Sequence, residues 1–399
     1  MNNFPKISKN THYKGFPSDI KVILGDYDSK SISEINAGDE IFVNSSKTDQ
    51  VQDVKKVMYR GIIKEIRCTG QVFNVNSTEN QKFYVIRKEI RDYCRKKYNK
   101  INLGVFEKNI EILSSGQLKN GDYLLIPKHH QVKKNSLIKT EEFVKTFSNN
   151  IRMKIPDIIP FTRQLFRWFG YYLAEGMILF SSDKRYKQKC RGVSFTIGID
   201  EIVLLNDIIC YGEEIFDIKP KVIRISERNA YRINFYNTQL GEFIFCLFNT
   251  GSSRKRIHPF LLSASEELLS ELINSWLKGD GWVCSSRGII IGNTTSFELV
   301  NQIYFILINL GELPSVGLSA HKNQNRNKAR ELGYYLRHNL YNIQLHNNKK
   351  RSHRKQNKSY MFTPILKTKN KQYEGYIFNL ELRNSSSFQA NYFLVNTDD

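Results

Sequence analysis

Two stretches of the sequence share one pattern, WFGYYLAEG at residues 168–176 and INSWLKGDG at residues 273–281. Each lies at the end of a segment with helical periodicity, and each places two small residues four positions apart, on one helix face. These small residues are Gly170, Ala174, Ser275 and Gly279. Small side chains at such positions let two helix backbones approach closely. We therefore predict two long helices that pack side by side about a pseudo-dyad.

Each of these two helices ends in an acidic residue, Glu175 in the first and Asp280 in the second. Packing about a pseudo-dyad would bring both carboxylates to the same end of the pair. A carboxylate opposes the helix dipole at a C-terminus, and two neighbouring carboxylates repel each other. A divalent cation relieves both penalties, so the pattern predicts a Mg²⁺ site of the kind that hydrolyses phosphodiesters. The alternative is two ordinary helix ends in which an acid precedes a glycine C-cap.

The elements around the two helices also repeat. We expect a buried helix over 161–180 and a second helix over 261–282, each followed by strands and a further helix. The further elements expected are strands 192–199, 220–226, 230–237, 283–293, 316–322 and 334–347, and helices 239–248 and 296–311. This duplication predicts one domain with halves at about 150–250 and 251–348.

The outer parts of the chain have β character. Residues 20–130 read as short strands with Gly-Asp turns and little helix, and residues 359–396 return to the same pattern. Both can belong to one domain if the middle of the chain is an insertion between ends that lie close together. The predicted division is an N-terminal part of a β domain (1–134), an inserted domain (135–348), and a basic linker with the C-terminal part of the β domain (349–399). The fold class expected is α+β.

The chain is strongly basic, with 60 Lys and Arg against 39 Asp and Glu and a formal net charge of +21. This favours a polyanionic partner, nucleic acid ahead of a membrane surface, with general solubility charge as the alternative. No apolar run is long enough to span a bilayer, and the N-terminus lacks the apolar core of a signal peptide. The six cysteines form no CxxC pair, which disfavours a zinc site and is typical of a reducing, intracellular compartment.

The paired helix ends resemble the motifs of LAGLIDADG homing endonucleases in their two-motif, single-chain form, and the resemblance covers about 150–347. It implies two αββαββα halves whose sheets form a saddle over double-stranded DNA. It also implies that Glu175 and Asp280 are catalytic acids that bind Mg²⁺, with Mn²⁺ able to substitute. Because both halves lie in one chain, we expect a monomer.

A lysine before the second motif is the third catalytic candidate. The stretch from Lys255 to Pro259 reads Lys-Arg-Ile-His-Pro and resembles the family's Lys-x-Ile-Pro block, with His258 shifting the proline by one position. By this match Lys255 would hold or activate water near the scissile phosphate. A DNA-backbone contact or a surface lysine is the alternative. In the second half the equivalent basic residue is Arg337 or His338.

Basic residues at the ends and hairpins of the expected strands are the candidates for DNA contact, because strand ribbons fit the major groove. These candidates are Lys184, Arg185, Lys187, Lys189, Arg191, Arg224, Arg228, Arg232, Lys322, Arg326, Lys328, Arg330 and Arg337. The sequence does not separate those that would read bases from those that would contact phosphates.

Three stretches of the β domain are distinctive: GFPSDIKVILGDYDSKSISEINAGDEI (15–41), GQLKNGDYLLIPK (116–128) and YEGYIFNLELRNSSSFQANYFLVN (373–396). Through them, residues 15–130 together with 359–396 resemble a Hint domain, the splicing module of inteins. The positions that splicing would need are Gly15, Thr78, Gln81, Val395, Asn396 and Thr397. Gly15 stands in place of a Cys or Ser nucleophile, Gln81 in place of the histidine of a Thr-x-x-His block, and Val395 in place of the penultimate histidine. We therefore expect an intein descendant that has lost splicing.

The β domain also contains a basic run, Arg87-Lys88 and Arg91 through Lys100, with Tyr93 and Tyr98 interleaved. Such a run suits contact with a nucleic-acid backbone, and a solvated face explains it equally well.

Three functional hypotheses follow. The first is a site-specific double-strand DNA endonuclease dependent on Mg²⁺, located inside the cell wherever its target DNA resides. The second is a non-cleaving DNA-binding protein or RNA maturase with the same fold. The third is a splicing intein, which Gly15, Gln81 and Val395 oppose.

Overall fold

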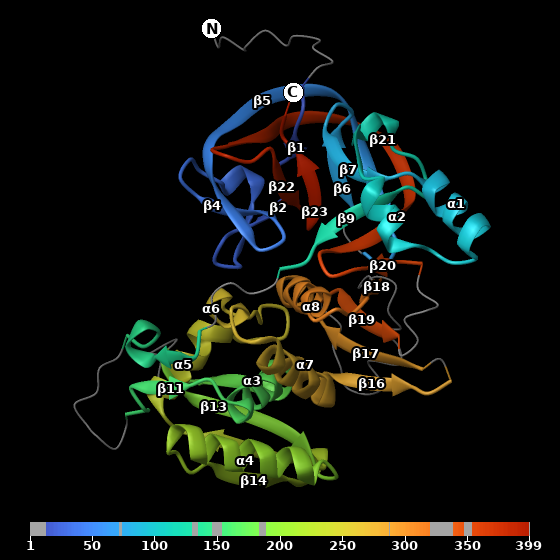
Figure 1. Cartoon of the computed structure of the whole chain (residues 1–399). Coiled ribbons are helices and arrows are strands. Elements are labelled where there is room, and N and C mark those ends of the chain that lie inside the picture. Colours follow the sequence, from blue (N-terminus) through green and yellow to red (C-terminus); the bar gives the residue numbers. More distant parts are fainter. Residues whose placement is uncertain are drawn as a thin grey trace, which may run out of the picture. The chain divides into compact units, whose positions relative to one another are not determined.

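The computed structural model describes residues 13–71, 74–129, 135–145, 154–182, 189–286, 288–319, 338–346 and 353–398. The chain divides into two compact units, coloured along the sequence in Figure 1. Unit 1 comprises Met1–Val132 and Asn348–Asp399, and unit 2 comprises Lys133–Asn347. Strands and helices occur in both units, which confirms the α+β class.

Unit 1 is built on a 13-stranded sheet in which the two chain segments alternate. Its strands are β1 (Phe16–Pro17), β2 (Lys21–Ile23), β3 (Ser29–Ser31), β4 (Glu40–Asn44), β5 (Lys47–Cys68), β6 (Val75–Thr78), β7 (Lys82–Ile86), β8 (Glu111–Ser114), β9 (Tyr123–Pro127), β20 (Lys355–Gln356), β21 (Tyr360–Leu382), β22 (Ser387–Ala390) and β23 (Phe393–Asn396). The longest strands, β5 and β21, pair antiparallel from Cys68↔Ile365 to Val51↔Leu382. The C-terminal segment therefore completes the sheet that the N-terminal segment begins.

Two helices in unit 1 contradict the expectation of little helix between residues 20 and 130. They are α1 (Lys88–Tyr98) and α2 (Leu103–Lys108), joined at Asn99, which is left-handed with φ 51°. Cys94 of α1 and Phe106 of α2 are fully buried in a cluster with Tyr123 and Phe362. The charged surface of this stretch hides an apolar face too narrow to give a clear helical period.

Unit 2 contains two four-stranded antiparallel sheets with helices packed on them. The first half runs α3 (Arg163–Glu175), β12 (Gly176–Phe180), β13 (Cys190–Gly198), α4 (Ile202–Phe216), β14 (Lys221–Ile225), β15 (Ala230–Phe235) and α5 (Thr238–Phe248). The second half runs α7 (Glu266–Asp280), β16 (Gly281–Cys284), β17 (Ile289–Thr294), α8 (Phe297–Asn309), β18 (Ser315–Ser319) and β19 (Leu340–His346). Within the part of unit 2 that the structure describes, no helix follows β19. A short α6 (Pro259–Leu262) precedes α7, and β10 (Leu137–Lys139) pairs with β11 (Ile158–Pro160).

The expected helix over 161–180 is wrong in its second part, because α3 ends at Glu175 and the next five residues form β12. Gly176 and Gly281 both have extended backbones, with φ of −82° and −113°, so neither is a left-handed C-cap. Each glycine is required by close approach: a Cβ at Gly176 would lie 2.2 Å from the Tyr172 ring, and one at Gly281 would lie 2.3 Å from the Leu277 carbonyl oxygen. The chain can pass directly from helix into strand only because both positions lack a side chain.

Helices α3 and α7 pack with their backbones in contact. A Cβ at Gly170 would lie 2.4 Å from the Leu272 carbonyl oxygen and 2.7 Å from the Cβ of Ser275. A Cβ at Gly279 would lie 2.5 Å from the Cβ of Ala174. The small residues therefore face one another in the pairs that the sequence pattern predicts.

Gly170→Ala should lower the free energy of unfolding by at least about 2 kcal/mol, because the added methyl must push the two helices apart. The matched control is Gly104→Ala in α2, where the nearest atom to an added Cβ is 3.4 Å away. This control should be neutral or slightly stabilising. Chemical denaturation of the full chain measures both; equal effects would contradict the packing assigned to Gly170.

Candidate active site at the paired helix ends

The two predicted acids lie together at the C-terminal ends of α3 and α7. Glu175 is the last residue of α3 and Asp280 the last residue of α7. The contact between the helices extends to this end, because a Cβ at Gly279 would lie 3.5 Å from Oε1 of Glu175. The carboxylate of Glu175 thus reaches across to the residue that directly precedes Asp280. The close packing of the helices is what brings the two acids to one place.

Both carboxylates occupy an environment that disfavours their charge. Burial raises the pKa of Glu175, and the negative charge of Glu201 raises it further. Burial also raises the pKa of Asp280 to about 7, with repulsion from Glu175 adding to the shift and the Lys255 ammonium opposing it. Two desolvated anions at helix C-termini gain stability when a cation joins them.

The donor set fits a hard divalent cation whose coordination is completed from outside the protein. Two carboxylates are suitable oxygen ligands for Mg²⁺, which keeps several waters and binds phosphate oxygens readily. Among the residues that the structure describes, no group of three or more His, Cys, Asp or Glu side chains could enclose a metal ion. With two carboxylates as its protein ligands, a Mg²⁺ ion here would take the rest of its coordination from water or phosphate oxygens.

Lys255 lies beside the acids but directs its donors to the helix. Its Nζ donates to the carbonyl oxygens of Tyr172, Leu173 and Ala174 at 2.9, 2.8 and 3.2 Å. An ammonium has three N–H donors, so all three go to the last turn of α3. Burial lowers the pKa of Lys255 to about 8, while attraction to Asp280 and then to Glu175 opposes this shift. In this arrangement Lys255 caps α3 and places a positive charge next to both carboxylates.

Helix α8 holds the backbone at Lys255 and directly after it. Ser296, the N-cap residue of α8, donates its hydroxyl to the Lys255 carbonyl oxygen at 2.6 Å. Gln302 bonds both the N–H and the carbonyl oxygen of Ile257, each at 2.7 Å. His258, which departs from the family's block, accepts a hydrogen bond from the Phe260 N–H at 3.3 Å and caps α6. Nothing in the sequence around Ser296 and Gln302 indicated these anchoring roles.

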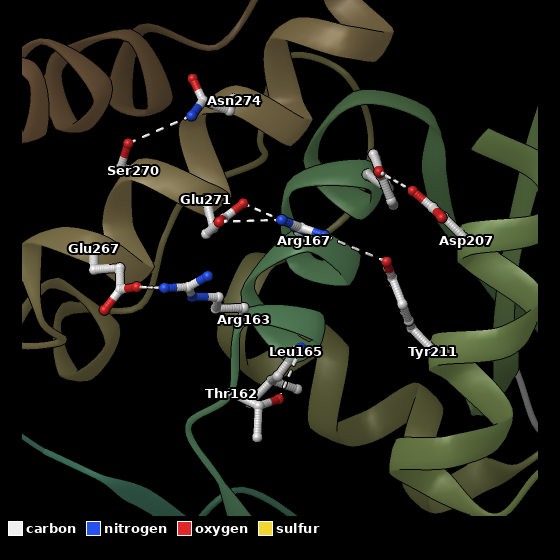
Figure 2. Close-up of polar contacts among 11 residues, drawn as sticks. Thr162, Arg163, Leu165, Arg167, Asp207, Tyr211, Glu267, Ser270, Glu271 and Asn274 are labelled. Carbon is white, nitrogen blue, oxygen red and sulfur yellow. Dashed lines mark hydrogen bonds and ion pairs between the residues drawn. The ribbon is translucent and has the colours of Figure 1, made fainter. Parts of the chain in front are cut away.

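A polar network joins α3 to α7 along the same seam, before the acids (Figure 2). Arg167 of α3 makes a two-pronged pair with Glu271 of α7 at 2.8 and 3.2 Å, and it also reaches the Tyr211 hydroxyl at 3.5 Å. One turn earlier Arg163 pairs with Glu267. These pairs join α3 to α7 at two further points along the seam.

The first sheet of unit 2 presents one face away from its helices. Phe195 and Phe235 contact Trp168 of α3, so their face is the covered one. Arg232 lies on the opposite face, paired with Thr196 and Ile223. Three polar residues on that opposite face were not singled out in the sequence. Ser194 donates its hydroxyl to Asn234 at 2.7 Å and both are buried, while Lys221 is exposed on the edge strand.

The other basic candidates of the first half lie elsewhere. Arg224 is opposite Tyr231 and shares the helix-covered face at the exposed edge strand β14. Arg228 lies in the turn between β14 and β15, while Lys189 and Arg191 are exposed at the start of β13. The remaining candidates fall outside the described residues: Lys184, Arg185, Lys187, Lys322, Arg326, Lys328, Arg330 and Arg337.

The second sheet has a corresponding uncovered face. A Cβ at Gly292 would lie 2.4 Å from the Trp276 ring of α7, so the face of Gly292 is covered. Asn342 and Gln344 of β19 point to the other face and bond each other at 3.1 Å. Trp282 shares that face through its pairing with Ile291 and is half exposed. His338 is exposed just before β19.

The positions that the Hint resemblance assigned to splicing all lie in unit 1. The Gly15 N–H donates to the Thr78 hydroxyl at 3.1 Å, and the Thr78 N–H donates to the Gly15 carbonyl oxygen at 3.0 Å. Gln81 donates its side-chain amide to the Asn396 carbonyl oxygen at 3.0 Å. Val395 pairs with Phe83, and the Thr397 N–H bonds the Ser386 carbonyl oxygen.

Gly15 occupies a position that a nucleophilic side chain does not fit. Its φ is +149°, and a Cβ would lie 2.6 Å from the Phe378 carbonyl oxygen. A cysteine or serine here would need both a strained backbone and a displaced strand.

None of the helices in the described residues is long and apolar enough to cross a membrane.

No family model matches the chain. Protein MJ0043 of Methanocaldococcus jannaschii is 22% identical over 93% of this chain and 48% of its own length. An iron-sulfur cluster assembly SufBD family protein of Mycobacterium tuberculosis is 24% identical over 57% of this chain and 26% of its own length. The ATP-dependent DNA helicase Hel308 of Thermococcus kodakarensis is 23% identical over 61% of this chain and 22% of its own length. The chain therefore spans about half or less of these relatives.

Two solved structures are similar to parts of the chain. One is I-DmoI in complex with DNA and Mn, with 12% identity, 46% of this chain and 89% of that chain covered, and a TM-score of 0.34. The other is the gp41-1 intein, with 16% identity, 29% of this chain and 69% of that chain covered, and a TM-score of 0.19. At TM-scores this low, neither likeness establishes a shared fold.

Lys255→Met should destabilise unit 2 by about 2 to 3 kcal/mol, because three carbonyl groups at the buried end of α3 lose their donors. Lys278→Met on the exposed surface of α7 is the matched control and should stay within about 0.5 kcal/mol of wild type. Denaturant titration distinguishes the two variants. If Lys255→Met leaves the free energy of unfolding unchanged, the capping role is contradicted.

Glu271→Gln should cost about 1 kcal/mol near neutral pH by removing the charge partner of Arg167. Pairing with Arg167 lowers the pKa of Glu271 below its ordinary value. A lowered folded-state pKa stabilises the protein above the unfolded pKa, and this contribution disappears as the pH falls through the folded value.

The gap in stability between wild type and Glu271→Gln should therefore close as the pH falls through the acidic range where glutamate titrates. Denaturation at several pH values measures the gap. The control is Glu267→Gln, whose pair with Arg163 is more than half exposed and should contribute little at any pH. A gap that stays constant with pH would contradict the ionic nature of the Arg167 contact.

Proposed function

We propose that unit 2 is a site-specific double-strand DNA endonuclease of the LAGLIDADG type that acts with Mg²⁺. The observation that carries the proposal is the pairing of two partly buried carboxylates, Glu175 and Asp280, at adjoining helix ends. Stability alone gives no reason to place two anions there, since both pKa values are raised by burial. Like charges that are partly desolvated and perturb each other are a signature of a functional site.

Each residue of the site has a distinct chemical task in this proposal. Glu175 and Asp280 would hold Mg²⁺, or Mn²⁺ in its place. A bound Mg²⁺ supplies charge stabilisation for a phosphodiester and lowers the pKa of a bound water. Lys255 favours the ionised form of the carboxylates through its charge and keeps the end of α3 in place through its three hydrogen bonds. Helix packing sets the distance between the acids before DNA binds.

The uncovered sheet faces supply the groups that DNA recognition needs. Arg232 and Lys221 would contact phosphates or guanine, and amides such as Asn342 and Gln344 suit adenine edges in the major groove. The net charge of +21 supports binding to a polyanion. By its resemblance to the family, cleavage would leave short 3′ overhangs.

Unit 1 is proposed to be the remnant of an intein that has lost splicing. The conformation of Gly15 and the contact of Gln81 with Asn396 support a splicing centre whose positions persist without its nucleophile or its histidines. The relatives support an inserted element as well, because partial matches occur in proteins as different as a SufBD family protein and a DNA helicase. The protein would then act inside the cell, as a monomer, wherever its target DNA lies.

A second function is favoured by one observation. Lys255 gives all three of its protons to the helix, which leaves it none for a water or a phosphate. A non-cleaving DNA-binding protein or an RNA maturase of the same fold would tolerate that arrangement.

The deciding experiment maps new double-strand ends after purified protein and Mg²⁺ are incubated with DNA of the source organism. The wild type should cut one or a few sites, and Mn²⁺ should support the same cuts. The Glu175→Gln/Asp280→Asn variant should cut none of them. The control variant is Glu267→Gln/Glu271→Gln, which removes two acids from the same helix pair away from the site and should still cut. Binding without cutting would favour the second function.

A further inference from the structure

A basic helix in unit 1 has no part in the proposed nuclease chemistry. Helix α1 lies at the periphery of unit 1 (Figure 1) and is firmly anchored there. The buried carboxylate of Asp122 accepts the Lys88 N–H at 3.0 Å and the Arg87 guanidinium at 3.3 Å, which fixes the first turn. Cys94 is fully buried, which fixes the middle. The fold therefore holds the outer face of α1 in a defined position.

That outer face carries positive charge with little compensation. The exposed cations are Arg95, Lys96, Lys97 and Lys100. The acids on α1 are Glu89 and Asp92, and Asp92 is already paired with Arg91 at 2.8 Å. Cations near a helix C-terminus suit the dipole, so a solvated face would explain the composition by itself.

The arrangement around Lys97 exceeds what a solvated face requires. Its Nζ donates to the Tyr93 hydroxyl at 2.9 Å and lies 5.4 Å from the ring centroids of both Tyr93 and Tyr98. Both rings are exposed, at 48% and 37%. Ordering an exposed lysine costs side-chain entropy, which the hydrogen bond and cation–π contacts offset. The result is an ammonium group and two hydroxyl groups that are already ordered at the surface before any ligand binds.

A second segment adds a cation beside Arg95. Lys355 comes from β20, far from α1 in sequence, and it lies close enough to Arg95 for the two charges to interact. Burial and then the Arg95 guanidinium lower the pKa of Lys355. The fold thus brings two cations from separate segments close together, which adds to the positive potential of this part of unit 1.

We propose that the α1 surface binds the phosphate backbone of double-stranded DNA. This surface consists of Tyr93, Arg95, Lys96, Lys97, Tyr98, Lys100 and Lys355. Ammonium, guanidinium and tyrosine hydroxyl groups are the donors that contact phosphate oxygens. Single-stranded nucleic acid is a poorer fit, because Tyr93 and Tyr98 pack edge to face, with 6.4 Å between their ring centroids, and offer no parallel faces to successive bases. The contact does not depend on the DNA sequence, and it adds to the DNA affinity of the proposed nuclease. This inference rests on the proposed function only in taking DNA as the ligand.

The test uses the full chain and needs no knowledge of the target site. Lys96→Ser/Lys97→Ser/Lys100→Ser is titrated against a short labelled duplex of arbitrary sequence, by fluorescence anisotropy, at a series of NaCl concentrations. Affinity at low salt should fall about tenfold or more, and the slope of log K against log salt should fall by about 0.9 for each phosphate that the variant no longer binds. An unchanged slope would overturn the proposal.

The matched control removes the same number of charges from another exposed part of unit 1. Lys367→Ser/Lys369→Ser/Lys371→Ser changes three exposed lysines of β21. It should reduce the slope clearly less than the α1 variant does. Equal reductions would overturn the proposal, because they would show a general charge effect. Stronger dependence of single-stranded DNA or RNA binding on the α1 lysines would overturn the assignment to duplex DNA.

Failure of the proposed nuclease is distinguishable from failure of this proposal. The Glu175→Gln/Asp280→Asn variant should lose cleavage but keep the wild-type salt slope. The α1 variant should keep the cut position at saturating protein while its salt slope falls. If the wild type cuts nothing and the salt slope of the α1 variant is still lower than that of the wild type, the proposed nuclease function is wrong, and DNA binding by the α1 surface remains supported.

Discussion

The close approach of α3 and α7 is the interaction on which the rest of unit 2 depends. At Gly170 and at Gly279 no room remains for even a methyl group. This contact brings the helix ends together and so brings together Glu175 and Asp280. The chain then turns directly from each helix into the first strand of a sheet, through Gly176 and Gly281, where a side chain would collide with Tyr172 or Leu277 of the same helix. The position of the acids therefore follows from one seam between two helices.

The seam also carries an electrostatic penalty that other parts of the chain offset. Two desolvated carboxylates lie at the ends of two helices whose dipoles already oppose them. Lys255 counters this with one buried charge and three hydrogen bonds to α3. Its backbone in turn is held by Ser296 and, through Ile257, by Gln302 of the second half. The stability of the first half's helix thus depends on residues of the second half, which couples folding of the halves to integrity of the site.

Much of this could be read from the sequence because the constraints are local. Small residues four apart, followed by an acid and a glycine, specify a helix face and a helix end within nine residues. Alternating apolar residues likewise marked most strands. The expected helix over 161–180 ran too far, because Met177 to Phe180 are apolar enough for either a buried helix or a paired strand. Helix α1 was missed because only a narrow stripe including Cys94 is buried, beneath a charged face.

The sequence by itself determined that two small-faced helices ending in acids would occur in a basic, two-part chain, since composition and spacing are properties of neighbouring residues. Only the tertiary structure decided where partners distant in sequence meet. It assigned the protons of Lys255 to the carbonyls of α3, about eighty residues earlier, and it placed Lys355 beside Arg95. It also decided which side of each sheet Arg232 and Arg224 occupy, because strand register, and not the identity of a residue, sets the face on which a side chain lies.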